Sequence, residues 1–277
     1  MFRTALLIAA GTTLLSGLAF STQASAQSSY GSGTAVAAQS TSPHAAWSAI
    51  LQNYVSAPDA QGVTHFAYGK LNANAADTAK LRSYIKSLEA TNPNNLSRNE
   101  AIALYANLYN ALTIDLIIQN YPLKSIRKAK VYNGDKVGGL RGPWKKVRTS
   151  VNGQAMSLND VEHEVLRKQF SSPYIHYMVN CASIGCPNLL NTAWEASTLE
   201  SVRKKAAADF INSPRGVKMT SKGLVISSIF KWFEVDFGGS KENVLKHIRQ
   251  YANPELAAAI DRGAKISGYD YDWSLNE

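Results

Sequence analysis

The feature that most constrains this fold is a long apolar segment between residues 97 and 122. Ser97 and Glu100 have the S-x-x-E spacing of a helix capping box, and Pro122 ends the segment. The apolar residues between them occupy more than one face of a helix, and they include Ile102, Leu104, Tyr105, Leu108, Leu112 and Leu116. A helix that is apolar on several faces has to be enclosed by other elements. The sequence therefore predicts a buried central helix.

The remaining segments predict an α+β fold. Helical spacing of apolar residues recurs at residues 45–54, 79–88, 199–211 and 242–251, and residues 157–160 predict the capped start of another helix. The pairs Asn133-Gly134, Asn152-Gly153 and Lys222-Gly223 are typical of hairpin turns, and the alternation over residues 174–180 predicts a strand. We expect a helical N-terminal half with the buried central helix, followed by a mostly antiparallel sheet with flanking helices.

The N-terminal region predicts export. Arg3, the apolar run 5–20 and the small residues 24–26 have the order of a secretory signal peptide, so residues 1–26 are expected to be removed. Residues 27–43 are rich in Ser, Gly, Ala and Thr and predict a flexible leader, and residues 44–277 are expected to form a single globular domain. No segment after the signal peptide is expected to cross a membrane. The expected location is the periplasm, or outside the cell if the protein is secreted.

Positive charge is concentrated in one segment. The chain has 29 Lys and Arg against 20 Asp and Glu, and residues 124–148 hold nine cationic side chains against Asp135 alone. Such a run is either a solvated face or a surface for anionic partners. In an exported protein the partner would be an acidic glycan or an anionic envelope surface, with Arg141, Lys145 and Lys146 as binding residues. Export argues against nucleic acid.

The two cysteines, Cys181 and Cys186, lie at the ends of a short loop of small residues. They are too few for a disulfide-dense scaffold or a four-thiolate zinc site. One interpretation is a disulfide, which an oxidising compartment favours and which Gly185 would allow. The other makes Cys181 a nucleophile, with backbone N–H groups that converge on its sulfur and a base within reach. Cys186 is the weaker nucleophile because Pro187, which follows it, has no N–H.

Two histidines are candidate bases. His163 lies on a separate helix that can pack beside the thiol loop, whereas His176, five residues before the first cysteine, would point to the opposite face of a strand. Asn110 or Asp236 could orient the imidazole of His163 through tertiary contact. Glu162 completes the candidate catalytic set, although adjacent helical residues do not face one another.

Buried amides give a second set of candidates. Asn107 and Asn110 are three apart on an apolar helix, so they either hold a neighbouring loop or line a polar cleft. Asn107 and Asn180 are candidate substrate-binding residues. A metal site is disfavoured because the chain has no H-E-x-x-H, no C-x-x-C and no close histidine pair. No cofactor is expected.

Together these stretches resemble the domain of unknown function 547 family, which is seen in exported bacterial proteins and in plant proteins. The matching stretches are residues 104–113, Tyr121-Pro122, 157–163, 176–187, 229–233, Asp236-Phe237 and 271–276. Tyr177 and Met178 stand where the family usually has Phe and Ala. The resemblance implies one domain of this type and marks as motif positions Asn107, Asn110, Glu162, His163, His176, Cys181 and Cys186. It implies no reaction.

Two functions remain open from the sequence. The first is an exported thiol-dependent hydrolase or acyltransferase, with Cys181 as nucleophile and His163 as base. Its comparison with papain or transglutaminase folds is an analogy of parts. The second is a non-catalytic periplasmic binding or envelope-scaffold protein, in which Cys181 and Cys186 form a disulfide and the basic segment binds an anion.

Overall fold

A computed structural model describes residues 42–129 and 143–277. Its helices are α1 (Ala45–Tyr54), α2 (Tyr68–Asn72), α3 (Ala75–Glu89), α4 (Arg98–Gln119), α5 (Lys168–Phe170), α6 (Ile175–Met178), α7 (Leu199–Ile211), α8 (Ile229–Trp232), α9 (Lys241–Tyr251) and α10 (Pro254–Asp261). Its strands are β1 (Val147–Val151), β2 (Gln154–Ser157), β3 (Val217–Thr220), β4 (Gly223–Ser227) and β5 (Ile266–Asp270). The α+β class is confirmed. The proposed signal peptide, the leader up to residue 41, the Asn133-Gly134 turn and Arg141 lie outside the described residues.

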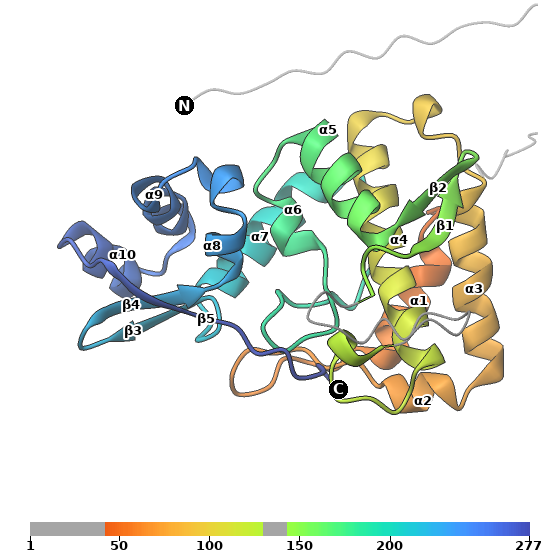
Figure 1. Ribbon diagram of the computed structural model, residues 1–277, viewed down its shortest axis with the longest axis horizontal. Coiled ribbons are helices and arrows are strands. Elements are labelled where there is room, and N and C mark those ends of the chain that lie inside the picture. Colours follow the sequence, from red (N-terminus) through yellow and green to blue (C-terminus); the bar gives the residue numbers. More distant parts are fainter. Residues whose placement is uncertain (1–41, 130–142) are drawn as a thin grey trace, which may run out of the picture. The chain divides into compact units, whose positions relative to one another are not determined.

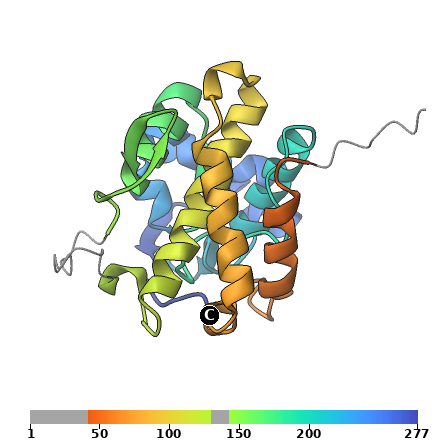
Figure 2. The same ribbon diagram turned by 90° about the vertical axis from the view of Figure 1, so that its right-hand side faces the viewer.

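The predicted central helix is α4, and its capping box is formed. The Ser97 hydroxyl accepts from the Glu100 N–H at 3.4 Å, and the Glu100 carboxylate accepts from the Ser97 N–H at 2.8 Å. Every residue from Ala101 to Ile118 is buried. Figure 2 shows α3 between α1 and α4, and a π-helical segment, Asp160–Arg167, also packs against α4. The helix is therefore enclosed by other elements, as its sequence predicts.

The length and apolar composition of α4 would also suit a membrane-spanning helix. Within the described residues it is the helix that is long and apolar enough to cross a membrane, a test that a buried core helix also passes. The whole of its most apolar window is buried inside the protein. Packing in the core accounts for its composition.

The strands form two small sheets that lie apart, with α6 and α8 between them (Figure 1). Strands β1 and β2 form the antiparallel hairpin predicted at Asn152-Gly153, and both turn residues have positive φ, 50° and 79°, as a type I′ turn requires. In the other sheet β3 and β4 are antiparallel, whereas β4 and β5 are parallel. Strand β5 was not predicted, because its short sequence Ile266–Asp270 lacks a regular alternation of apolar residues.

The predicted strand over residues 174–180 is wrong. Residues Ile175–Met178 form the short helix α6, which begins with hydrogen bonds from the Ile175 and His176 N–H groups to the carbonyls of Ser172 and Pro173. All four residues of α6 are buried, so the alternation of residue types does not correspond to two faces of a strand. Tertiary packing decides the conformation here.

Helix α10 was also missed, although its start carries a recognisable signal. The Asn253 side chain accepts from the Leu256 N–H at 2.9 Å, and Pro254 occupies the first helical position. This is the usual N-cap and proline arrangement.

The burial of α4 predicts a large effect of truncating its side chains. Leu108 is fully buried, so Leu108→Ala should lower the free energy of unfolding by about 2 to 5 kcal/mol, the cost of a core cavity. Denaturant unfolding followed by circular dichroism measures this. The control Met219→Ala, at a position that is 40% exposed, should change it by less than about 0.5 kcal/mol. Equal effects of the two variants would contradict the assignment of the core.

Candidate functional site

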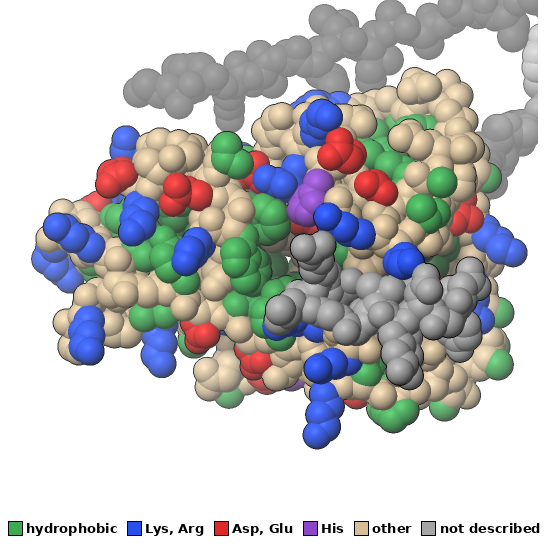
Figure 3. Space-filling model, in the orientation of Figure 1, with side chains coloured by type: hydrophobic (Ala, Val, Ile, Leu, Met, Phe, Trp, Pro, Cys, Tyr) green, Lys and Arg blue, Asp and Glu red, His purple; other side chains and the backbone are tan. Residues whose placement is uncertain are grey.

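A cavity of about 230 Å³ brings together several of the predicted residues. Its wall includes both cysteines, His163, His176, Glu162, Asn159, Lys145 and Tyr271, and the rings of Tyr109, Trp144, Trp232, Phe233 and Trp273. Figure 3 shows hydrophobic side chains gathered around α8 on this face, with a histidine at their edge. An apolar cavity with a few convergent polar groups is the usual form of a small-molecule site.

The loop that carries the thiols is held from the core by two asparagines. The Asn110 amide donates to the Met178 carbonyl at 2.9 Å and accepts from the Asn180 N–H at 2.8 Å. The Asn180 side chain then closes the loop, because it donates to the Pro187 carbonyl and accepts from the Ala182 N–H, both at 2.8 Å. Asn110 therefore positions backbone and does not orient an imidazole.

Asn107 has a similar structural role. Its amide donates to the Trp194 carbonyl at 2.9 Å and accepts from the Trp194 N–H at 3.0 Å. Neither Asn107 nor Asn180 lines the cavity. Their amides are engaged within the core, so the structure places them as supports of loops and not as contacts to a substrate.

The C-terminal segment pairs with the thiol loop along its other edge. The N–H groups of Ile184 and Gly185 donate to the carbonyls of Ser274 and Asp272, both at 2.8 Å. A side chain at Gly185 would place its Cβ 2.8 Å from the Asp272 nitrogen and 2.9 Å from the Tyr271 ring. This close approach requires glycine at position 185.

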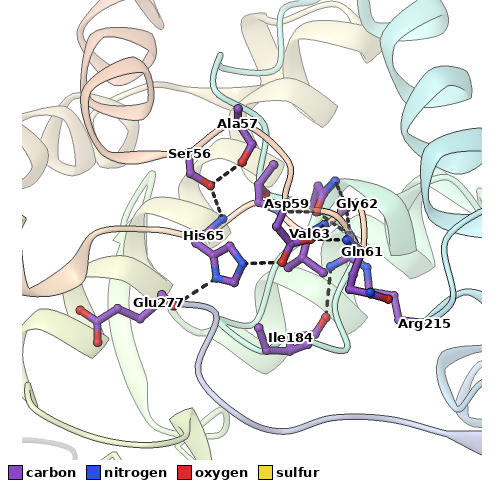
Figure 4. A network of polar contacts seen from close by, with 12 residues as sticks. Ser56, Ala57, Asp59, Gln61, Gly62, Val63, His65, Ile184, Arg215 and Glu277 are labelled. Carbon is purple, nitrogen blue, oxygen red and sulfur yellow. Dashed lines mark hydrogen bonds and ion pairs between the residues drawn. The ribbon is translucent and has the colours of Figure 1, made fainter.

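Arg215 holds the same loop from a third direction (Figure 4). Its guanidinium donates to the Ile184 carbonyl at 3.1 Å and to the Gly62 carbonyl at 3.2 Å, and it also contacts the Asn188 side chain. Figure 4 also shows His65 between Asp59 and the Glu277 carbonyl, at 3.0 and 3.1 Å. The thiol loop is thus connected to residues 56–65 and, through them, to the end of the chain.

Both cysteines are free in the structure, and both sulfurs contact the hydroxyl group of Tyr271. The Tyr271 Oη lies 3.1 Å from the Cys181 Sγ and 3.0 Å from the Cys186 Sγ. The Cys181 N–H donates to the Cys186 Sγ at 3.0 Å. The expectation that N–H groups converge on the Cys181 sulfur is therefore wrong, because the loop curls so that they meet the sulfur of Cys186.

The two thiols differ in acidity. Burial opposes ionisation of Cys186, yet hydrogen bonds from the Cys181 thiol, the Tyr271 hydroxyl and the N–H groups of Cys181 and Ser183 lower its pKa. The hydrogen bond to Cys186, together with burial, raises the pKa of Cys181 well above its usual range. When the pair loses one proton, the negative charge is therefore on the Cys186 sulfur and Cys181 stays protonated.

Asp236 orients a histidine, but it is His176 and not His163. The His176 Nε2 lies 2.6 Å from one Asp236 oxygen. Arg167 binds the same carboxylate through two nitrogens, at 2.6 and 3.2 Å, and its Nη1 lies 3.1 Å from the His163 Nδ1. Burial acts to raise the pKa of Asp236, but the hydrogen bonds from His176 and Arg167 lower it to about 2. Burial lowers the pKa of His176, although Asp236 opposes this. The result is an ionised aspartate beside a neutral imidazole.

Glu162 is a titratable group of the cavity with a pKa near neutrality. Burial raises its pKa to about 7, against the opposing effects of a hydrogen bond from Tyr109 and the charge of Arg167. A carboxyl group with such a pKa can donate or accept a proton near pH 7. Its closest approach to His163 Nδ1 is 3.9 Å, too long for a hydrogen bond.

Sequence reasoning missed Arg167 and Tyr271. Arg167 lies four residues after His163, and this helical spacing would have placed the two side chains together. Tyr271 lies 85 residues beyond Cys186, so only tertiary structure could bring its hydroxyl to the thiols. Among the predicted anion-binding residues Lys145 lines the cavity and Lys146 does not. Across residues 42–129 and 143–277, no group of three or more His, Cys, Asp or Glu has the arrangement of a metal site.

Burial of Glu162 predicts a specific pH dependence of stability. Its folded-state pKa lies above the unfolded value of 4.5, so its contribution to stability is present below pH 4.5 and is lost as the pH rises through about 7. The loss amounts to about 3 kcal/mol for a shift of this size. Between pH 4.5 and pH 8 the wild type should therefore lose about this much unfolding free energy relative to the Glu162→Gln variant.

The control for this measurement is Glu164→Gln, an exposed neighbour that pairs with Lys168 at 3.2 Å. The unfolding free energy of this variant should depend on pH in the same way as that of the wild type. A Glu162→Gln variant whose stability follows that of the wild type at every pH would show that Glu162 is not a buried acid.

Comparison with known proteins gave one match, which covers the central helix α4 and the thiol loop. Searches of curated proteins and of solved structures each found no match. The family model described as "Protein of unknown function, DUF547" matches residues 93–211. This segment holds α4, Glu162, both cavity histidines and both cysteines, whereas Asp236 and Tyr271 lie beyond it. Residues 93–211 of the chain are thus similar to the DUF547 family, whose function is unknown.

Proposed function

We propose that this protein is an exported thiol-dependent hydrolase or acyltransferase. One observation carries the proposal: the Cys181–Cys186 pair and the Asp236-oriented His176 open onto the same cavity. A nucleophile, a base and a group that orients the base are the components of covalent acyl transfer.

Cys181 is the attacking sulfur. It is partly exposed, whereas Cys186 is only 3% exposed. As a substrate carbonyl approaches, the Cys181 thiol passes its proton to the Cys186 thiolate, and the Cys181 sulfur forms a bond to the carbonyl carbon. The bond to the leaving group breaks, and protonated Glu162 gives its proton to the leaving atom.

His176 serves the second half of the reaction and takes the role that the sequence assigned to His163. Its Nε2 donates to ionised Asp236, so its Nδ1 carries the lone pair. Nδ1 takes a proton from water, the water oxygen attacks the thioester carbon, and the carbon–sulfur bond breaks. The proton on Cys186 returns to Cys181, and the proton on His176 restores Glu162. In a transferase another hydroxyl or amine takes the place of water.

The alternative is a non-catalytic binding or envelope-scaffold protein with a Cys181–Cys186 disulfide and a basic surface for an acidic glycan. The shared contact with Tyr271 places the sulfurs near one another, which a disulfide also needs. Thiol titration of native, unreduced protein separates the two functions. Two free thiols support the enzyme, and none supports the scaffold.

The thiol pair predicts an order of alkylation that can be measured cleanly, because the chain has no other cysteine. Iodoacetamide at pH 7 should label Cys181 faster than Cys186, as read by peptide mass spectrometry. Rapid labelling of Cys186 in Cys181→Ser would move the nucleophile to Cys186, and equal labelling of both would remove the catalytic proposal.

Removal of the proposed base, His176, should slow the hydrolysis of the acyl-enzyme. In His176→Ala, hydrolysis of p-nitrophenyl acetate should slow by about 10² to 10⁴, the usual contribution of a general base. The acetyl group should accumulate on Cys181, which intact-mass measurement detects. His247→Ala is the matched control, since His247 is a buried histidine that bonds Tyr177 at 2.8 Å and does not line the cavity. Equal rates in the two variants would exclude His176 as the base.

A further inference from the structure

The contact between Arg167 and His163 determines where His163 carries its proton. A guanidinium can only donate hydrogen bonds. Because the Arg167 Nη1 lies 3.1 Å from the His163 Nδ1, that nitrogen must accept, and so it has no proton. In a neutral imidazole the proton is then on Nε2.

His163 is held in the neutral form by its surroundings. Burial, the positive charge of Arg167 and the nearby His176 all lower its pKa, and Asp236 and Glu164 oppose them. The Glu162 carboxyl lies 3.9 Å from the same Nδ1 and makes no hydrogen bond to it.

Arg167 is itself fixed, so it cannot easily leave His163. Two of its nitrogens bind the Asp236 carboxylate, and its guanidinium stacks 4.7 Å from the centre of the Phe233 ring. The His163 ring lies against the same Phe233, with 5.9 Å between ring centres. One cation therefore joins Asp236, which orients His176, to His163.

The free end of His163 is directed to the reaction space. The ring lines the cavity, its side chain is 30% exposed, and within the described residues Nε2 has no hydrogen-bond partner. A donor at this position can reach the oxygen of a bound carbonyl.

We propose that Arg167 is a positioning residue that fixes the proton of His163 on Nε2, so that His163 acts as a hydrogen-bond donor to the substrate carbonyl and not as a base. The role of the donor rests on the proposed acyl transfer. Negative charge develops on the carbonyl oxygen when the sulfur attacks, and a neutral imidazole N–H placed there stabilises it. The two histidines then have different roles, because His176 takes protons and His163 donates a hydrogen bond.

The first test reads the position of the proton without any activity. ¹⁵N–¹H correlation spectra of histidine-labelled protein at pH 7 should show His163 as the neutral Nε2–H form. Arg167→Met, which removes the donor, should shift His163 toward the Nδ1–H form and raise its pKa. The control Arg98→Met removes an arginine that also stacks on a phenylalanine, at 5.2 Å, but lies outside the cavity, and it should leave the His163 signals unchanged. A charged His163, a proton on Nδ1, or an unchanged spectrum in Arg167→Met would overturn the proposal.

The second test reads the donor role. With p-nitrophenyl acetate, His163→Ala should slow acylation of Cys181 by about 10² to 10³, as expected for loss of one oxyanion donor. His163→Gln keeps an N–H donor but cannot act as a base. It should recover most of the acylation rate that His163→Ala loses. Equal loss in both variants would show that His163 acts as a base and would overturn its donor role. If the wild type is not acylated at all, the donor role fails together with the proposed function, and the spectra still decide whether Arg167 fixes the proton.

Discussion

The structure depends on the enclosure of α4. A helix buried from Ala101 to Ile118 has no water beside it, so any amide that it carries must find a partner within the protein. Asn107 and Asn110 meet this requirement through the backbone of Trp194 and of residues 178–180. The central helix thereby determines where the thiol loop begins. The same two amides that would destabilise the core if left unpaired connect it to the candidate site.

The thiol loop is held on every side by polar contacts to distant segments. Asn180 closes it, the C-terminal residues pair with it, and Arg215 ties it to residues 56–65. Ala182, inside this loop, has a φ of 60°, a conformation that is uncommon for residues other than glycine. Such a backbone persists only where surrounding contacts hold it in place. A site built in this way has its two sulfurs positioned before any substrate arrives, and that reduces the cost of reaching the reactive geometry.

Charge around the cavity is arranged in two separate groups. The Cys186 thiol, whose pKa is lowered by hydrogen bonds from Cys181 and Tyr271, belongs to one group, and Arg167 and Asp236 pair their opposite charges beside the two imidazoles in the other. Both histidines stay neutral because burial outweighs the attraction of Asp236. Glu162, whose pKa is raised to about 7, can exchange a proton near neutral pH. Each titratable residue can thus have a different function within one cavity.

The sequence by itself determined the elements whose signals are local. The capping box at Ser97 and Glu100, the Asn152-Gly153 turn and the apolar spacing of α1 and α7 each reflect contacts between residues a few positions apart, so they could be predicted. The short helix α6, the pairing of His176 with Asp236 and the position of Tyr271 between the sulfurs could not. Those contacts join residues 60 to 90 positions apart, or depend on burial from all sides. The sequence supplied the reactive residue types, and only the tertiary structure decided which of them meet, because hydrogen bonds between distant residues follow from packing around α4 and not from spacing along the chain.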